Sequence, residues 1–196
     1  MAVEIIYETH QTSTDNEAGI ATGWLPGALS ALGRRQAREL GERRRHDGLA
    51  AVFTSDLRRA VETAEIAYRA TDIPLFQDAR LRECNYGELN GAPVSLIAAE
   101  RAHRVSTPFP GGQSYEDVVQ NMAAFLRDLA AEWDDTRILL IAHSANLWAL
   151  QVLLDGARLE EVVSSPPDWQ PGWFFTLPAA KTEPAHAGAE PTGDGM

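Results

Sequence analysis

Residues 137–154 read RILLIAHSANLWALQVLL, and this stretch decides the fold class. Its first six residues, RILLIA, form the clearest buried strand in the chain, and Asn146–Leu154 has the pattern of a helix. Similar short apolar runs occur at Val3–Tyr7 and at Leu49–Thr54, the second followed by the helical pattern Leu57–Tyr68. Because strands that alternate with helices form parallel sheets covered on both faces, the sequence predicts an α/β three-layer sandwich with a mainly parallel central sheet.

Other segments extend this pattern. Leu29–Arg45 carries apolar residues at helical spacing, with Ser30 as its expected N-cap, and Ser114–Trp133 is the longest helical pattern. Ser55-Asp56 are expected to cap the helix that follows them. Gly172–Leu177, GWFFTL, is interpreted either as a last strand of the core or as a contact in a homodimer.

Length and charge limit the domain organisation and the partners. The 196 residues suit one domain, expected over residues 1–180, and the Pro-, Gly- and Ala-rich residues 181–196 are expected to form a disordered tail. The net charge of −11 argues against nucleic-acid and membrane partners. A single cysteine, no signal-peptide pattern and no membrane-spanning stretch predict a cytoplasmic protein.

Two histidines follow predicted strands. His10 comes after the first strand, and His143 comes directly after RILLIA. Ligands bind at the carboxyl ends of parallel strands, so both side chains are candidates for one site. His46 and His103 lie in charged, surface-like stretches, and His186 lies in the predicted tail.

Candidate anion-binding and acidic residues follow the other strands. Arg59 falls in the first turn of a predicted helix, where helix-terminal N–H groups also favour an anion, and we expect it to point inward. Arg58 and the run Arg43-Arg44-Arg45 are interpreted as solvated residues. Glu83 lies in the Gly-punctuated stretch LRECNYGELNG; beside a phosphorylated centre its pKa would be raised, so it could act as a proton donor.

Several motifs together resemble the histidine phosphatase superfamily, in the branch that contains phosphoglycerate mutases and small broad-specificity phosphatases. The resemblance runs in order over about residues 3–178. Its motifs are THQTSTDN (9–16), LSALG (29–33), SDLRRAVETA (55–64), LRE (81–83), GGQS (111–114) and His143 after its strand.

The resemblance implies a phosphomonoesterase of small phosphorylated metabolites that needs neither a metal nor a cofactor. His10 would attack phosphorus and form a phosphohistidine. His143 and Arg59 would stabilise the transferring group, and Glu83 would protonate the leaving oxygen. Further substrate contacts are expected from Thr9, Ser13, Asn16 and Ser144.

The motif around the nucleophile departs from the family pattern. Thr9 stands where the family has arginine, and Gln11 stands where it has glycine. Three explanations are open. Another arginine supplies the charge, the substrate needs less charge, or the protein binds ligands without turnover. The candidate arginines are Arg34, Arg82, Arg101 and Arg104.

Other functions fit the sequence less well. AHSAN (142–146) resembles a nucleophile elbow around Ser144, but it lacks the flanking glycines, and the only later histidine is His186. Cys84 as a phosphatase nucleophile would require an arginine six residues later, where Asn90 stands. The length and the GGQS sequence favour a phosphatase over a phosphoglycerate mutase-type phosphotransferase.

Overall fold

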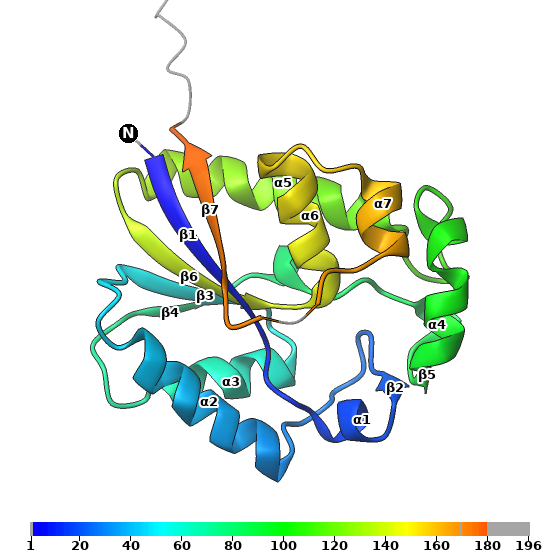
Figure 1. Cartoon of the computed structure of the whole chain (residues 1–196), viewed down its shortest axis with the longest axis horizontal. Coiled ribbons are helices and arrows are strands. Elements are labelled where there is room, and N and C mark those ends of the chain that lie inside the picture. The colour runs from blue at the N-terminus through cyan, green and yellow to red at the C-terminus, as the bar shows by residue number, and fades with distance from the viewer. Residues whose placement is uncertain (1, 169, 180–196) are drawn as a thin grey trace, which may run out of the picture.

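The central sheet is mostly parallel and has helices on both faces, which confirms the predicted fold class (Figure 1). The computed structural model describes residues 2–168 and 170–179. Strand β7 pairs with β1 in antiparallel orientation, and the other pairs in the sheet are parallel. In the order of the sheet the strands are β4 (Leu75–Gln77), β3 (Ala51–Thr54), β6 (Arg137–Ala142), β1 (Ala2–Thr9) and β7 (Trp173–Pro178).

Helices and short elements connect these strands. The α-helices are α1 (Thr14–Glu17), α2 (Ala31–Arg44), α3 (Arg58–Tyr68), α4 (Val94–Glu100), α5 (Tyr115–Glu132), α6 (Ser144–Leu154) and α7 (Leu159–Ser164). The 3-10 helices are η1 (Ala79–Leu81), η2 (Gly87–Leu89) and η3 (Arg101–Arg104). A separate two-stranded sheet pairs β2 (Ile20–Ala21) with β5 (Ala92–Pro93).

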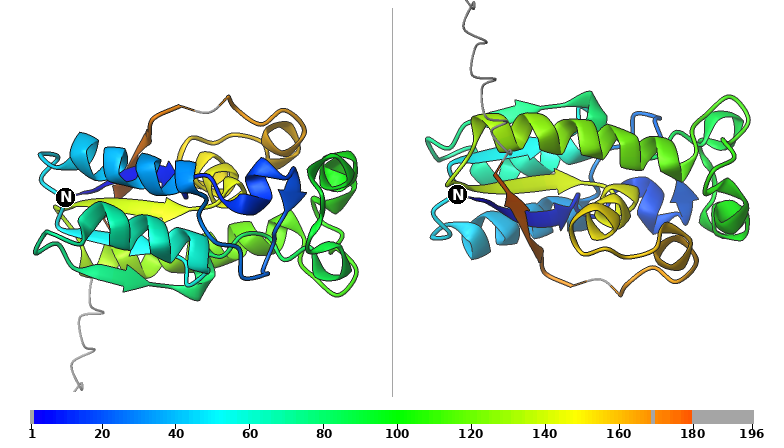
Figure 2. Two further views of the ribbon diagram at one scale, coloured as in Figure 1. Left: turned by 90° about the horizontal axis from the view of Figure 1, so that it is seen from below. Right: turned by 90° about the horizontal axis from the view of Figure 1, so that it is seen from above.

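Neighbouring residues of the central strands face opposite layers. Ile5 and Tyr7 belong to a buried cluster with residues of α5 and α6, whereas Ile6 belongs to a second cluster with residues of α2 and α3. In β6, Leu140 belongs to the first of these clusters and Leu139 to the second. Because helices cover both faces of the sheet (Figure 2), residues 5–7 of β1 and 138–142 of β6 are apolar at successive positions.

A third buried cluster lies beyond the carboxyl ends of the strands. Ile97 of α4 packs there with Phe109, Tyr115 and Trp148. The segment from α4 through η3, here called the cover, therefore has its own apolar anchor (Figure 2).

The helix predictions are confirmed in most of their details. Ser30 and Ser114 accept hydrogen bonds from the first turns of α2 and α5. The predicted caps of α3 are wrong: the N-cap is Leu57 and makes no side-chain bond. The Ser55 hydroxyl is instead within hydrogen-bond distance of the His143 ring, as described below.

The prediction of a solvated run at the end of α2 is wrong for Arg44. Its side chain is buried and donates to Glu8 Oε1 from Nε at 3.0 Å and from Nη2 at 2.8 Å. Nη2 also donates to the carbonyl of Pro171. A Cβ on Gly172 would lie 2.0 Å from Nη2, so glycine leaves the space that this guanidinium needs.

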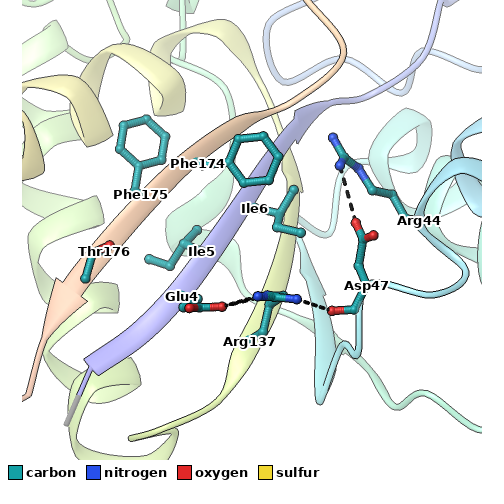
Figure 3. A pocket seen from close by; sticks show the side chains of 9 residues that line it. All are labelled: Glu4, Ile5, Ile6, Arg44, Asp47, Arg137, Phe174, Phe175 and Thr176. Atoms are coloured by element: carbon teal, nitrogen blue, oxygen red, sulfur yellow. Dashed lines mark hydrogen bonds and ion pairs between the residues drawn. The ribbon is translucent and has the colours of Figure 1, made fainter.

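A pocket of about 360 Å³ lies beside this ion pair, near the start of β6 (Figure 3). Glu4 accepts from Arg137, and Arg137 also donates to the carbonyl of Asp47. Arg44 is bound to Asp47 and Glu8. The arginines that line this pocket are therefore already paired with protein groups.

Two expectations concern the chain as a whole. The predicted tail, residues 181–196, lies outside the described residues, and the domain boundary at 180 stays a prediction. No helix in the described part of the chain is both long and apolar enough to cross a lipid bilayer.

Candidate active site

The two predicted histidines meet at the carboxyl ends of neighbouring strands. Thr9 of β1 is in register with Ala142 of β6, and the His10 N–H donates to the Ala142 carbonyl at 2.9 Å. Each histidine directly follows its strand, so the two rings come together with their centroids 5.1 Å apart. Parallel pairing of β1 and β6 thus creates the site.

Hydrogen bonds fix the tautomer of His10. Its Nδ1 lies 2.8 Å from the carbonyl oxygen of Gln11, which can only accept, so Nδ1 carries the proton. Nε2 then holds a lone pair, and Arg59 Nε donates to it at 3.2 Å. His10 therefore presents Nε2 as a nucleophilic atom.

The Arg59 side chain points inward, as predicted, and contacts both histidines. From the first turn of α3 its buried side chain donates through Nη2 to the Gly23 carbonyl at 2.9 Å, and Nη2 lies 3.3 Å from His143 Nδ1. Nη1 is buried and has no hydrogen-bond partner in the protein. Nη1 and Nε are thus the donors that a phosphoryl group at His10 Nε2 would meet.

Ser55 holds the ring of His143. Its Oγ lies 2.7 Å from His143 Nε2 and accepts from the Leu57 N–H. The His143 carbonyl accepts a short hydrogen bond from the Tyr7 hydroxyl, and its N–H donates to Asn146 Oδ1. The fully buried His143 is therefore held at both its ring and its backbone.

Glu83 is a buried carboxyl group at the pocket wall. Its Oε1 accepts from the Cys84 N–H at 2.8 Å and from the Ala145 N–H at 3.4 Å. Burial raises its pKa, and this exceeds the lowering by the two N–H groups and by Arg59 and Arg101. A carboxyl group with a raised pKa is suited to act as a general acid.

Both histidines are held in the neutral form. Burial, together with the charge of Arg59, lowers the pKa of His10 to about 3. Burial and the charge of Arg59 lower the pKa of His143 well below its usual value, and a proton on His10 would lower it further. The positive charge of the pocket therefore comes from its arginines.

A pocket of about 190 Å³ opens onto these groups. Its walls include His10, Arg59 and Glu83, and two of the predicted substrate contacts, Asn16 and Ser144, also line it. The other residues that line it are Ile20, Ala21, Thr22, Gly23, Tyr86, Val94, Ile97, Arg101 and Trp148.

The other predicted contacts are placed differently. Ser13 is fully buried and caps α1: its Oγ accepts from the Asn16 N–H, and Asn16 Oδ1 accepts from the Ser13 N–H. Asn16 therefore keeps Nδ2 as a donor for a ligand. Thr9, at the end of β1, is not among the residues that line the pocket.

The substitution of glycine by Gln11 is accommodated without backbone strain. Among the described non-glycine residues only Asp135 has a positive φ, so Gln11 adopts an ordinary conformation. Its side chain is buried and donates to the Thr9 carbonyl, and its N–H donates to Thr63 Oγ1. Gln11 thus helps to hold the loop that carries His10.

Some residues of the site have roles that the local sequence does not indicate. Ser55 has the pattern of a helix cap but contacts His143. Trp24 donates through Nε1 to the Glu83 carbonyl at 2.7 Å, while Arg82 lies over its ring. Cys84 is fully buried, and burial raises the pKa of its thiol, which argues against a nucleophilic role.

Comparison with known proteins identifies the family of this chain. The family model for the histidine phosphatase superfamily (branch 1) matches residues 9–167. A 2,3-bisphosphoglycerate-dependent phosphoglycerate mutase of Methylobacterium sp. (strain 4-46) is 30% identical over 173 residues, 81% of this chain and 83% of that protein.

Solved structures give the same result. Bacillus stearothermophilus YhfR is 28% identical, with a TM-score of 0.76 over 85% of this chain and 86% of that one. A mycobacterial glucosyl-3-phosphoglycerate phosphatase in complex with VO3 is 27% identical, with a TM-score of 0.72 over 82% of this chain and 86% of that one. The chain belongs to the histidine phosphatase superfamily.

Proposed function

We propose that the protein is a metal-independent phosphomonoesterase that acts on a small phosphorylated metabolite through a phosphohistidine on His10. The observation that carries this proposal is the state of His10: Nδ1 is fixed as a donor to Gln11, and Nε2 holds a lone pair beside Arg59. The ring is neutral far below pH 7, so it needs no separate base. The similarity to a phosphatase of known structure supports the hydrolytic reading.

The reaction has two chemical steps. In the first, His10 Nε2 forms a bond to phosphorus, the ester P–O bond breaks, and protonated Glu83 gives its proton to the leaving oxygen. In the second, the Glu83 carboxylate takes a proton from water. The oxygen of the hydroxide formed in this way attacks phosphorus and the P–N bond breaks. Inorganic phosphate then leaves, and His10 returns to its free form.

Arg59 supplies the electrostatic stabilisation in both steps. Its unpartnered Nη1 and its Nε are donors at the position of the transferring phosphoryl group. The Asn16 side chain, which also lines the pocket, adds a neutral donor. In this mechanism the charge that a metal would otherwise provide comes from arginine.

The test is phosphate release from a panel of phosphomonoesters by the wild type and His10→Asn. We expect the variant to lose at least about 10³-fold in kcat, since it lacks the nucleophile. The wild type should also form an acid-labile, base-stable phosphoryl adduct, detected by ³¹P NMR after rapid quenching. EDTA should leave the rate unchanged.

Three other results would replace the proposal. Equal rates for the two proteins would show that His10 is not the nucleophile. Phosphate binding without release from any ester would make this a ligand-binding member of the family. Faster transfer between phosphoglycerates than to water, with 2,3-bisphosphoglycerate present, would identify a mutase instead.

A further inference from the structure

Trp24 contacts the backbone of the proposed acid from outside the pocket. Its indole N–H donates to the carbonyl of Glu83 at 2.7 Å, and the residue is 36% exposed. Trp24 is not among the residues that line the pocket, nor does it belong to any of the three buried clusters that the described residues form. The indole therefore contributes little to the core, and its own hydrogen bond is with the segment that carries the acid.

A fixed arginine lies over the ring of Trp24. The guanidinium carbon of Arg82 is 4.6 Å from the ring centroid, and Arg82 donates to the two carboxylate oxygens of Asp56 through Nε and Nη2. The bidentate ion pair fixes the plane of the guanidinium, and a guanidinium over an indole is a favourable cation–π contact. Asp56 and Arg82 therefore hold the indole that binds Glu83.

The residue before Trp24 holds the arginine of the site. The Gly23 carbonyl accepts from Arg59 Nη2 at 2.9 Å. The backbone N–H of Trp24 donates to Asn90 Oδ1 at 3.3 Å, which attaches this segment to the chain beyond Glu83. Two consecutive residues, here called the Gly23-Trp24 link, thus connect the arginine that faces the transferring phosphoryl group with the backbone of the acid.

The backbone around Glu83 is held by side chains from two separate elements. Trp24 binds the carbonyl of Glu83 itself, and Asn146 Nδ2 of α6 donates to the carbonyl of Arg82 at 3.3 Å. Asn146 also accepts from the His143 N–H, so its replacement would disturb a histidine of the site as well. Removal of the Trp24 N–H releases the acid while the bonds of Asn146 remain.

We propose that Trp24 is a positioning residue for Glu83: the Gly23-Trp24 link holds the acid where its proton can reach the leaving oxygen of a phosphoryl group bound at Arg59. Because Trp24 lies outside the pocket lining, it acts through Glu83 rather than on the substrate, and it exchanges no proton. This inference rests on the proposed function and adds a residue to it. A shift of about 1 Å in a reacting group can cost about 10²-fold in rate, so one N–H group can govern the protonation step.

Trp24→Phe tests the inference, because it keeps an aromatic ring beneath Arg82 and removes the N–H donor. For an alkyl phosphate, whose leaving group needs a proton, we expect kcat to fall about 10- to 100-fold and KM to change less than about 3-fold. The phosphorylation burst with p-nitrophenyl phosphate should slow less than about 3-fold. Equal losses on the two esters, or no loss on the alkyl ester, would overturn the inference.

Trp133→Phe is the matched control. Its indole packs edge-on against Phe53 and Phe76, and it does not line the pocket of the described residues. We expect the rates on both esters to stay within about 3-fold of the wild type. A selective loss on the alkyl ester in this control would show that the effect follows from any altered tryptophan, and the inference would be wrong.

A double-mutant cycle separates positioning from a general effect on the site. In the Glu83→Gln protein there is no acid to position, so the addition of Trp24→Phe should change the alkyl-ester rate less than about 2-fold. If Trp24→Phe lowers that rate as much in the Glu83→Gln background as in the wild type, Trp24 acts independently of Glu83. That result would refute the inference even if the single variant behaves as expected.

Titration of Glu83 separates this inference from the proposed function, because it requires no turnover. ¹³C NMR of the side-chain carboxyl groups, with Glu83→Gln to assign the signal, measures the pKa of Glu83 in each protein. Burial is the largest cause of its raised pKa, so release of the segment in Trp24→Phe should admit water and lower that pKa by at least about 0.5. An unchanged pKa would show that Trp24 does not hold the acid. Absence of turnover on every ester would overturn the proposed function alone.

Discussion

Glu83 shows how a single residue acquires its role from its surroundings. The carboxyl group is 9% exposed, and burial raises its pKa although two N–H groups and two arginines oppose the rise. The sequence alone predicts a raised pKa for Glu83 from the charge of a neighbouring phosphate. In the structure, burial of the carboxyl group is the largest cause of the raised pKa of Glu83.

Glu83→Gln should therefore slow the hydrolysis of alkyl phosphates about 10²- to 10⁴-fold, because an alkoxide cannot leave without a proton. With p-nitrophenyl phosphate, whose leaving group needs no proton, formation of the phosphohistidine should slow much less. Comparison of burst rates and steady-state rates for the two ester types measures this difference. Equal losses in the burst phase would argue against an acid role.

The pH profile gives a second measure of the same group. Because the acid must be protonated, kcat/KM for an alkyl ester should fall as the pH rises through the raised pKa of Glu83. His10 should impose no acid limb above its pKa of about 3. The Glu83→Gln profile should lose the alkaline fall; a profile that keeps it would assign that fall to another group.

Still at the scale of residues, the sequence identified the candidate catalytic residues better than the residues that hold them in position. His10, Arg59, Glu83 and His143 come together as the resemblance implies. The contact of Ser55 with His143 joins the ends of two strands that are distant in the chain. A capping residue and a residue that orients a histidine look alike in sequence, because both are a serine after a strand.

At the scale of elements, the junction of α2 and β1 depends on a buried ion pair. Glu8 is 1% exposed and Arg44 is 7% exposed, and Arg43 also donates to Glu8. The expectation of a solvated run failed because the end of a helix is usually exposed, and nothing local in the sequence places Glu8 beside it. Arg44 is buried because of its position in the fold beside Glu8, which the local sequence pattern does not reveal.

Arg44→Met should lower the free energy of unfolding by about 3 kcal/mol, since it leaves a buried carboxylate with one partner fewer. Urea denaturation measures this change. Arg45→Met, at the exposed neighbouring position, is the matched control and should change stability by less than about 0.5 kcal/mol. If Glu8→Gln combined with Arg44→Met recovers none of the loss, the ion pair is not its cause.

Long or fully buried elements were predicted well, and short, mostly exposed ones were not. RILLIA matches β6 residue for residue, and the pattern of Ser114–Trp133 matches α5 with its cap. The short strand β4 was missed because its three residues are exposed and have no alternation to detect. The helices α4 and α7 were missed because they too are short, with a single buried residue each.

At the scale of the whole molecule, the two neutral histidines make the fold sensitive to acid. Because His10 and His143 have lowered pKa values in the folded state, the unfolded chain binds more protons than the folded protein below about pH 6.5. Stability should therefore fall as the pH drops from 6.5. Each such histidine contributes a slope of about 1.4 kcal/mol per pH unit.

His10→Asn removes one of these groups, so its stability should fall less steeply than that of the wild type between pH 6.5 and 4.5. Urea unfolding at four pH values measures both slopes, and the difference at pH 7.5 gives the pH-independent effect of the substitution. The raised pKa of Glu83 acts in the opposite direction and is present in both proteins. Identical slopes would mean that His10 is protonated in the folded protein.

The position of β1 in the sheet also governs when the candidate site can first assemble during synthesis. The strand that leads to His10 is made first, yet its neighbours are β6 and β7, and contacts such as Glu4–Arg137 span 133 residues. Contacts this distant in sequence form late and slow the folding of a chain. A nascent polypeptide that has not yet delivered β6 from the ribosome therefore carries His10 without a partner strand, and only chains translated beyond His143 can assemble the site.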